Sequence, residues 1–214
     1  MDFPRNILKY YLSNVYFFCG TACGGKTTIS KAFAEKHGFL WAGEDLIYEE
    51  FSHVATPEEQ PVVFSRPATW EEYFNRPYKE HHEWLQAVQK EQLPMTLLEL
   101  MRLSTNKPVV ADIFMPVQTA LSLAEADKIV FLVAEPEMVL RDFWRRHDHM
   151  DIYNCIMGLK EPAKSMENVN NGLTYSTWLF LDDLYKSRAY AIKRTNESTV
   201  EDTLALVEAF FGFN

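Results

Sequence analysis

The stretch Val15–Thr27 reads VYFFCGTACGGKT and joins an uninterrupted apolar run to a glycine-rich turn. From Gly20 onward it matches G-x-x-x-x-G-K-[ST], a pattern expected by chance about 0.01 times in a chain of this size. Glycines let the backbone curl so that successive N–H groups point inward, toward an anion. The apolar run predicts a strand, and the following residues predict a helix whose positive end faces the turn. The stretch therefore predicts a phosphate-binding loop.

The loop residues have separate expected tasks. Lys26 would reach the β- and γ-phosphates of a nucleoside triphosphate, and the Thr27 hydroxyl would join the ligands of a Mg²⁺ ion. We therefore expect ATP and Mg²⁺ as cofactors. The residues expected to bind the nucleotide are Gly20, Thr21, Ala22, Cys23, Gly24, Gly25, Lys26, Thr27 and Thr28. A glycine-rich turn without a ligand is the weaker alternative, because the motif lies between a predicted strand and a predicted helix.

Composition narrows the class of partner. The chain has 214 residues and a formal net charge of −9, with no long run of Lys or Arg. A nucleic acid is therefore not expected as a partner, since its phosphates require a basic face. No apolar run approaches the length that spans a bilayer, so no membrane partner is expected. Three cysteines at irregular spacing predict neither a disulfide framework nor a zinc site, and a reducing cytoplasm is the expected location.

Short apolar runs alternate with helical patterns along the chain. The runs are not interrupted by polar residues, which is typical of parallel strands covered on both faces. The predicted strands are Val15–Cys19, Phe39–Ala42, Pro108–Ile113, Ile129–Ala134 and Ala189–Lys193. The predicted helices are Thr27–His37, two that begin at Pro94 and Pro116, Glu137–Arg146, Leu173–Ser187 and Val200–Phe211. This alternation predicts an α/β fold with a mainly parallel five-stranded sheet.

The chain resembles the P-loop kinases of nucleotides and small metabolites, such as adenylate, shikimate and gluconate kinases. The resemblance rests on the loop motif and covers most of the chain except residues 52–92, which are rich in aromatic residues, His and Arg. It implies a P-loop NTPase three-layer fold in one domain, residues 1–214. Residues 52–92 would form a helical insertion that shapes the acceptor site, and residues 141–160 would form a lid. Arg66, Arg76 and the insertion's aromatic residues are where we expect the second substrate.

Two acidic residues stand at strand ends where kinases of that family carry functional acids. Asp45, after the predicted second strand, resembles the acid that faces the phosphoryl acceptor and takes its proton, with Glu44 as the alternative. A helix cap is an equally good interpretation of Asp45. Asp112 ends the predicted third strand, where the resemblance implies a ligand of Mg²⁺ together with Thr27.

Arginines follow the predicted fourth strand. Arg141 and Arg145 are four residues apart, so we expect them on one helical face, with Arg146 nearby. Guanidinium groups there would stabilise the charge of a transferring phosphoryl group. The alternative is a solvated helix in which these arginines pair with neighbouring acids. The segment Lys193–Asn196 resembles the one that lies against adenine in these kinases.

The sequence also departs from this family. Cys23 stands where many small kinases have glycine. Nucleoside monophosphate kinases often have an arginine just after the second-strand acid and another soon after the third strand, and this chain has neither. A hydroxylated small metabolite therefore fits better than a nucleotide as acceptor. The expected activity is an ATP-dependent phosphotransferase, that is, a small-molecule kinase. A nucleoside monophosphate kinase and a non-catalytic nucleotide-binding regulator are the alternatives. A switch GTPase is disfavoured, because neither D-x-x-G nor N-K-x-D is present.

Overall fold

The computed structural model describes residues 4–44, 51, 53–146 and 149–213. Within them, one sheet has the strand order β2-β3-β1-β4-β5, and all four neighbouring pairs are parallel. The strands are β1 (Val15–Gly20), β2 (Leu40–Gly43), β3 (Val109–Asp112), β4 (Ile129–Val133) and β5 (Ala191–Lys193). Each lies at a predicted strand to within a few residues at either end. The predicted parallel five-stranded sheet is confirmed.

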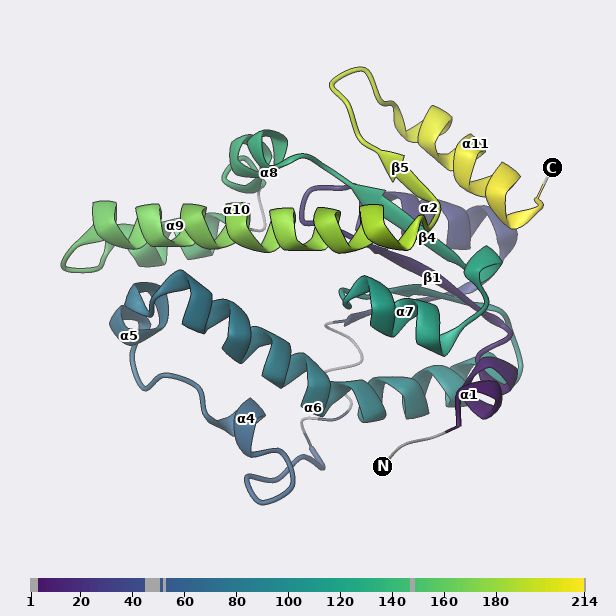
Figure 1. The fold of residues 1–214 in the computed structure, drawn as a ribbon, viewed down its shortest axis with the longest axis horizontal. Coiled ribbons are helices and arrows are strands. Elements are labelled where there is room, and N and C mark those ends of the chain that lie inside the picture. The colour runs from purple at the N-terminus through teal and green to yellow at the C-terminus, as the bar shows by residue number, and fades with distance from the viewer. Residues whose placement is uncertain (1–3, 45–50, 52, 147–148, 214) are drawn as a thin grey trace.

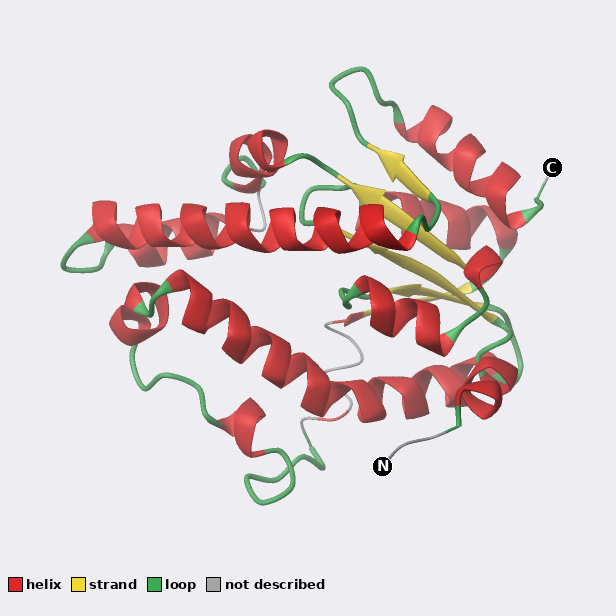
Figure 2. Ribbon diagram, viewed as in Figure 1, coloured by secondary structure: helices red, strands yellow, loops and turns green. Residues whose placement is uncertain are grey.

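Helices lie on both sides of this sheet (Figures 1 and 2). They are α1 (Arg5–Tyr11), α2 (Lys26–His37), α4 (Pro61–Phe64), α5 (Trp70–Asn75), α6 (Tyr78–Ser104), α7 (Val117–Leu123), α8 (Pro136–Phe143), α9 (Met150–Met157), α10 (Pro162–Ser187) and α11 (Val200–Phe211). A short 3-10 turn, η1 (Ala126–Lys128), precedes β4. None of the described helices combines the length and apolar composition that a membrane crossing needs.

Alternating side chains of the central strand β1 enter two different cores. Phe17 packs with residues of α1, α6, α7 and α10 on one face of the sheet. Phe18 packs with residues of α2 and α11 on the other face. Because both faces are covered, all six residues of β1 are buried. The predicted three-layer arrangement is confirmed.

Helix α6 corrects one sequence-based expectation. We expected Pro94 to begin a helix, but it lies inside the 27-residue helix Tyr78–Ser104. Proline removes one N–H donor and crowds the preceding turn, so a helix that continues through it bends. Figure 1 shows that the axis of α6 changes direction about midway along its length. Packing of Leu97 and Leu100 in the core holds the second half of the helix in place.

Helix α10 is also longer than predicted, because it begins at Pro162 and not at Leu173. Its polar first half is fixed by contacts with the insertion. The Asn168 side-chain amide donates to the carbonyls of Phe74 (2.8 Å) and Arg76 (2.7 Å). These bonds use the peptide groups at the end of α5 and hold the two helices together.

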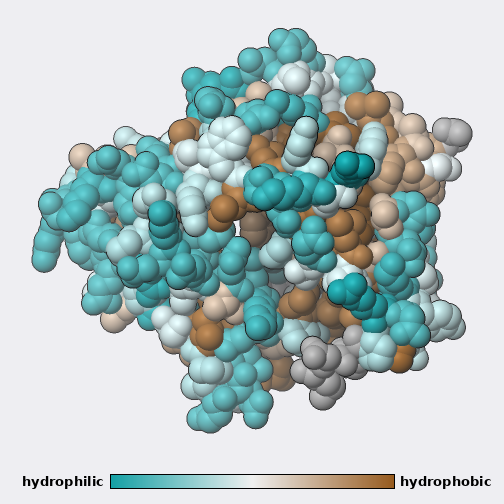
Figure 3. All heavy atoms as spheres, viewed as in Figure 1, coloured by the Kyte–Doolittle hydropathy of each residue, from teal (hydrophilic) through white to brown (hydrophobic). Residues whose placement is uncertain are grey.

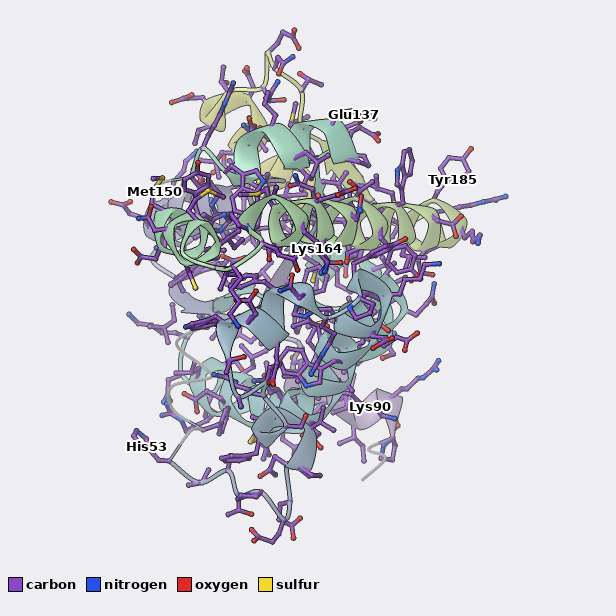
Figure 4. All side chains as sticks on the ribbon, turned by 90° about the vertical axis from the view of Figure 1, so that its left-hand side faces the viewer. His53, Lys90, Glu137, Met150, Lys164 and Tyr185 are labelled. Carbon is purple, nitrogen blue, oxygen red and sulfur yellow. The ribbon has the colours of Figure 1, made fainter. Side chains whose placement is uncertain are left out.

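Residues 52–92 contain α4, α5 and the first half of α6, so the helices expected there are present. The Glu91 carboxylate accepts hydrogen bonds from the N–H groups of Val62 (3.0 Å) and Val63 (2.8 Å) at the start of α4. It thus satisfies backbone donors that a helix start leaves open. Figure 4 shows this region, with His53 and Lys90, below α9 and α10, with Met150 and Lys164. In Figure 3 this end of the molecule, at the left, is mainly hydrophilic, and hydrophobic residues gather over the sheet.

Candidate active site

The phosphate-binding loop lies directly against strand β4, and this contact explains two of its glycines. A Cβ atom on Gly20 would lie 1.8 Å from the Leu132 carbonyl oxygen, and one on Gly24 would lie 2.2 Å from the same atom. Gly20 also has a φ of +139°, a conformation that other residues rarely adopt. Both positions therefore require glycine. The strict motif demands only the first, and the need for Gly24 comes from packing.

Thr21 fastens the loop to the chain beyond β4. Its buried hydroxyl accepts a hydrogen bond from the Ala134 N–H (2.8 Å) and donates one to the Ala134 carbonyl (3.3 Å). One side chain thus satisfies both peptide groups of a buried residue. This threonine occupies an unrestricted position of the motif, so its anchoring role could not be read from the sequence.

Cys23 has a φ of +55°, in the left-handed region that favours glycine. This observation gives a physical reason for the glycine that related loops carry at this position. The Cys23 carbonyl accepts a hydrogen bond of 2.6 Å from the guanidinium of Arg194, just after β5. Arg194 also pairs with Asp142, at 3.0 Å. The loop conformation is therefore supported from two distant parts of the chain.

Lys26 begins helix α2 and is half-buried. Its ammonium donates to the Thr21 carbonyl across the loop, at 2.8 Å. Burial lowers the pKa of Lys26, and the charges of Asp112 and Glu44 oppose that shift. These two carboxylates therefore lie near the ammonium, as expected for groups at the carboxyl ends of neighbouring strands. In the register of the sheet, Asp112 is opposite both Phe18 and Gly43.

A cavity of about 590 Å³, which we call the loop cavity, opens beside the loop. Residues 23–29 form one side of it. The other side includes Asp142, Arg145, Arg146, Arg194, Ser198 and Thr203. Helix and loop N–H groups, a lysine and three arginines are the chemistry that binds a polyphosphate. Ser198 and Thr203 were not predicted, because no motif marks them.

The three arginines predicted near the lid occupy different environments. Arg145 and Arg146 line the loop cavity, and the charge of Arg146 adds to the burial that lowers the pKa of Lys26. Arg141 is not among the cavity residues. It bonds instead to Asp142 (2.7 Å) and Asn196 (2.7 Å). Helix α8 ends at Phe143, so the expectation that Arg141 and Arg145 share a helical face is wrong.

Of the segment Lys193–Asn196, which was predicted to lie against adenine, only part lines the loop cavity. Arg194 lines the loop cavity, whereas Lys193 forms an ion pair with Glu135 at 2.5 Å and Asn196 accepts from Arg141. The Asp142 carboxylate binds both Arg141 and Arg194, so it connects the segment after β5 with the arginine of α8. The hydrogen bond from Arg141 is the main reason that the pKa of Asp142 is lowered, with a smaller contribution from Arg194.

A second cavity of about 570 Å³, which we call the α6 cavity, lies at the ends of β2 and β3. It is lined by Glu44, Phe51, α6 residues between Glu83 and Thr96, and residues 113–116 and 119. The Glu44 carboxylate accepts a hydrogen bond from the Phe114 N–H at 3.1 Å. Asp45, the predicted acceptor-facing acid, lies outside the described residues. Neither Arg66 nor Arg76 lines this cavity, although we expected them to bind the second substrate.

The insertion's aromatic residues surround a third cavity of about 390 Å³, which we call the aromatic cavity. Its lining includes Trp70, Tyr73 and Phe74 of α5 together with His81 and His82 of α6. Tyr73 contacts Phe74 edge to face, with ring centroids 5.0 Å apart, and His81 in the same way at 4.8 Å. The ring of His82 also contacts Tyr175 of α10, with centroids 5.4 Å apart.

The two side chains predicted to bind Mg²⁺ are an exposed hydroxyl at Thr27 and a buried carboxylate at Asp112. Within the described ranges, no three or more His, Cys, Asp or Glu residues are grouped as metal ligands. Mg²⁺ usually keeps several waters and takes other oxygens from nucleotide phosphates, so one hydroxyl and one carboxylate beside a phosphate site fit it. The residues present are therefore compatible with a Mg²⁺–nucleotide complex.

Comparisons with known proteins show the fold. No protein-family model matches the chain, and no curated protein matches it. Shikimate kinase from Acinetobacter baumannii in complex with shikimate is one similar solved structure, at 18% identity. The match covers 98% of each chain with a TM-score of 0.50. TT1252 from Thermus thermophilus is similar at 17% identity over 91% of this chain and 96% of that one, with a TM-score of 0.45. The match to the shikimate kinase structure shows that the two chains share a P-loop α/β fold, as predicted.

Proposed function

We propose that this chain is an ATP-dependent kinase that transfers the γ-phosphoryl group to a hydroxylated small molecule. The observation that carries the proposal is a cavity lined by Lys26 together with a second cavity lined by Glu44, whose carboxylate lies near the Lys26 ammonium. The loop cavity contains the phosphate-binding loop, and Glu44 of the α6 cavity lies close enough to affect the pKa of the Lys26 ammonium. A donor and an acceptor bound in these cavities would meet at the loop.

In this proposal the loop N–H groups and Lys26 hold the donor phosphates. Thr27 and Asp112 would hold Mg²⁺, which supplies positive charge to the β- and γ-phosphates when it is bound. Of the three arginines predicted to stabilise the transferring group, Arg145 and Arg146 line the loop cavity and Arg141 does not. Residues 141–160, which contain these arginines and α9, would act as the lid.

The acceptor hydroxyl attacks the γ-phosphorus, the bond to the bridging oxygen of ADP breaks, and the hydroxyl proton passes to a carboxylate. Asp45 remains the predicted carboxylate for that step, and Glu44, the alternative, lines the α6 cavity. Such a reaction gives ADP and a phosphate monoester. It asks the protein mainly for positioning and charge stabilisation.

The test is ADP formation from Mg-ATP across pools of hydroxylated metabolites, sugars, nucleosides and nucleotides, with the Lys26→Ala variant as the blank. Stimulation by any pool above the blank supports a kinase. If the protein binds ATP and no pool raises its turnover above the blank, the kinase proposal is wrong and a nucleotide-binding regulator takes its place.

A further inference from the structure

The residues that line the α6 cavity indicate what kind of molecule it could bind. Residues 113–116 and the side chains of Phe51 and Leu93 give it an apolar floor. Polar side chains from α6 also line the cavity, and they are Glu83, Gln86, Gln89, Lys90, Gln92 and Thr96. Glu83, Gln86 and Lys90 are three and four residues apart, so they follow one face of the helix. A cavity with an apolar floor and convergent polar groups is typical of a small-molecule site.

The charged residues that line this cavity do not favour an anion. Among its described lining residues the charged ones are Glu44, Glu83 and Lys90, so two carboxylates face one ammonium. Proteins usually recognise carboxylates and phosphates with arginine, whose guanidinium makes two parallel hydrogen bonds. No arginine belongs to the described lining of the α6 cavity.

One backbone N–H beside this cavity is already bonded to a carboxylate. The Phe114 N–H already donates to the Glu44 carboxylate, at 3.1 Å. An anionic group placed there would meet the Glu44 carboxylate, and such like-charge contacts cost several kcal/mol.

The arginines of the insertion and of α6 have other contacts. The Arg76 guanidinium lies 5.0 Å from the centre of the Trp84 ring. The Arg102 Nε atom donates to the Glu99 carboxylate at 2.7 Å. Neither these two residues nor Arg66 lines the α6 cavity. They therefore do not supply the positive charge that its walls lack.

We infer that the phosphoryl acceptor is a hydroxylated compound without a carboxylate or phosphate group, and that an amine on it is recognised by the Glu83 carboxylate. This inference rests on the proposed function, since it concerns the second substrate of the same reaction. The apolar floor would hold the carbon skeleton, and the amides of α6 would hold its hydroxyl groups.

The experiment sorts the acceptors by charge. ADP formation from Mg-ATP is measured with pools of neutral polyols and sugars, of amine-bearing alcohols and amino sugars, and of hydroxy acids and sugar phosphates. Glucose, glucosamine and gluconate form a matched set within these pools. We expect stimulation by the amine pool, with the anionic pool at least roughly tenfold weaker. Stimulation by the anionic pool alone would overturn the inference and leave the kinase proposal intact. No stimulation by any pool would refute both.

A variant pair then tests the role of Glu83 on the best amine acceptor. Glu83→Gln should raise KM for that acceptor roughly two- to fivefold, because exposed ion pairs contribute modestly. KM for ATP should stay unchanged. Glu80→Gln makes the same charge change on an exposed residue of the same helix that does not line the cavity, so it is the matched control. Equal effects of both variants, or none from Glu83→Gln, would contradict the assignment of Glu83.

Discussion

The guanidinium of Arg194 donates a 2.6 Å hydrogen bond to the carbonyl of Cys23, 171 positions earlier in the chain. This bond ties the end of β5 to the middle of the phosphate-binding loop. The loop at that point has an unfavourable conformation, since Cys23 is not glycine and has a φ of +55°. Arg194 therefore helps to hold the loop in this conformation.

The first prediction concerns Arg194. Arg194→Ala should weaken Mg-ATP binding by roughly 5- to 30-fold, the equivalent of about 1–2 kcal/mol for a charged hydrogen bond reduced by partial exposure. The measurement is an equilibrium titration with a fluorescent ATP analogue. Lys193→Ala is the control, because Lys193 carries the same charge and bonds outside the loop cavity. If both variants bind equally well, Arg194 does not support the loop.

The second prediction concerns stability. Thr21→Val keeps the shape of the side chain and removes both hydrogen bonds to Ala134. It should lower the free energy of unfolding by about 1–3 kcal/mol, because buried peptide groups lose their partner. Urea unfolding measures this loss. Thr28→Val, on an exposed side chain of α2, should change the stability by less than about 0.5 kcal/mol. A Thr21→Val protein as stable as wild type would mean that water replaces the hydroxyl.

The third prediction compares the contributions to kcat of two arginines in the segment predicted to form a lid. Arg145 lines the loop cavity, whereas Arg141 is held by Asp142 and Asn196. With the acceptor found, Arg145→Ala should lower kcat by roughly 10²-fold or more, since such donors act on the transition state. Its effect on nucleotide affinity should be much smaller. Arg141→Ala should reduce kcat far less. The reverse order would show that Arg141 moves into the site during turnover.

The fourth prediction concerns pH. Burial lowers the pKa of His81 below its ordinary value of 6.5, and the charges of Arg76 and His82 act in the same direction. The pKa of His82 is also lowered by burial, against the opposing charge of Glu83. Below pH 6.5 the unfolded chain takes up protons more readily than the folded one, so stability falls as pH drops. The loss should level off below the folded-state pKa values.

His81→Phe tests this pH dependence. The His81 Nδ1 atom is buried and has no hydrogen-bond partner among the described residues, and the ring contacts Tyr73 at 4.8 Å. Phenylalanine keeps that ring contact and cannot be protonated. The variant should match or exceed the wild-type stability at pH 7.5 and lose less of it at pH 5. Parallel stability curves for the two proteins across this range would exclude a contribution from His81.

The fold could be predicted from the sequence because its signals are local. The apolar strands and the loop motif depend on neighbouring residues, so the parallel sheet and the α2 helix followed directly. Long helices were harder to predict. Pro94 and the polar segment before Leu173 are typical of helix ends or loops. In the structure, Leu97 and Leu100 pack in the core beyond Pro94, and Asn168 of α10 bonds to the end of α5.

The candidate site was predictable only where a motif marks it. Lys26, Arg145 and Arg146 line one cavity and Asp112 lies near the lysine, while the roles expected of them stay predictions. The anchoring roles of Thr21 and Arg194 depend on partners more than 100 residues away in the chain. No spacing rule encodes such contacts. The surroundings of Arg141 likewise depend on Asn196, beyond the last strand.

The most direct test of the central claim is nucleotide binding by the phosphate loop itself. A fluorescent ATP analogue is titrated with wild type and with Lys26→Ala in the presence of Mg²⁺, and unlabelled ATP is used as competitor. Lys26 is half-buried and bonded to Thr21, so unfolding of each protein is measured alongside to show that the variant is folded. We predict saturable binding that ATP displaces and that weakens at least roughly tenfold in the variant, as loss of a charged phosphate contact requires. Absence of binding to wild type, or equal binding to a folded variant, would contradict the account.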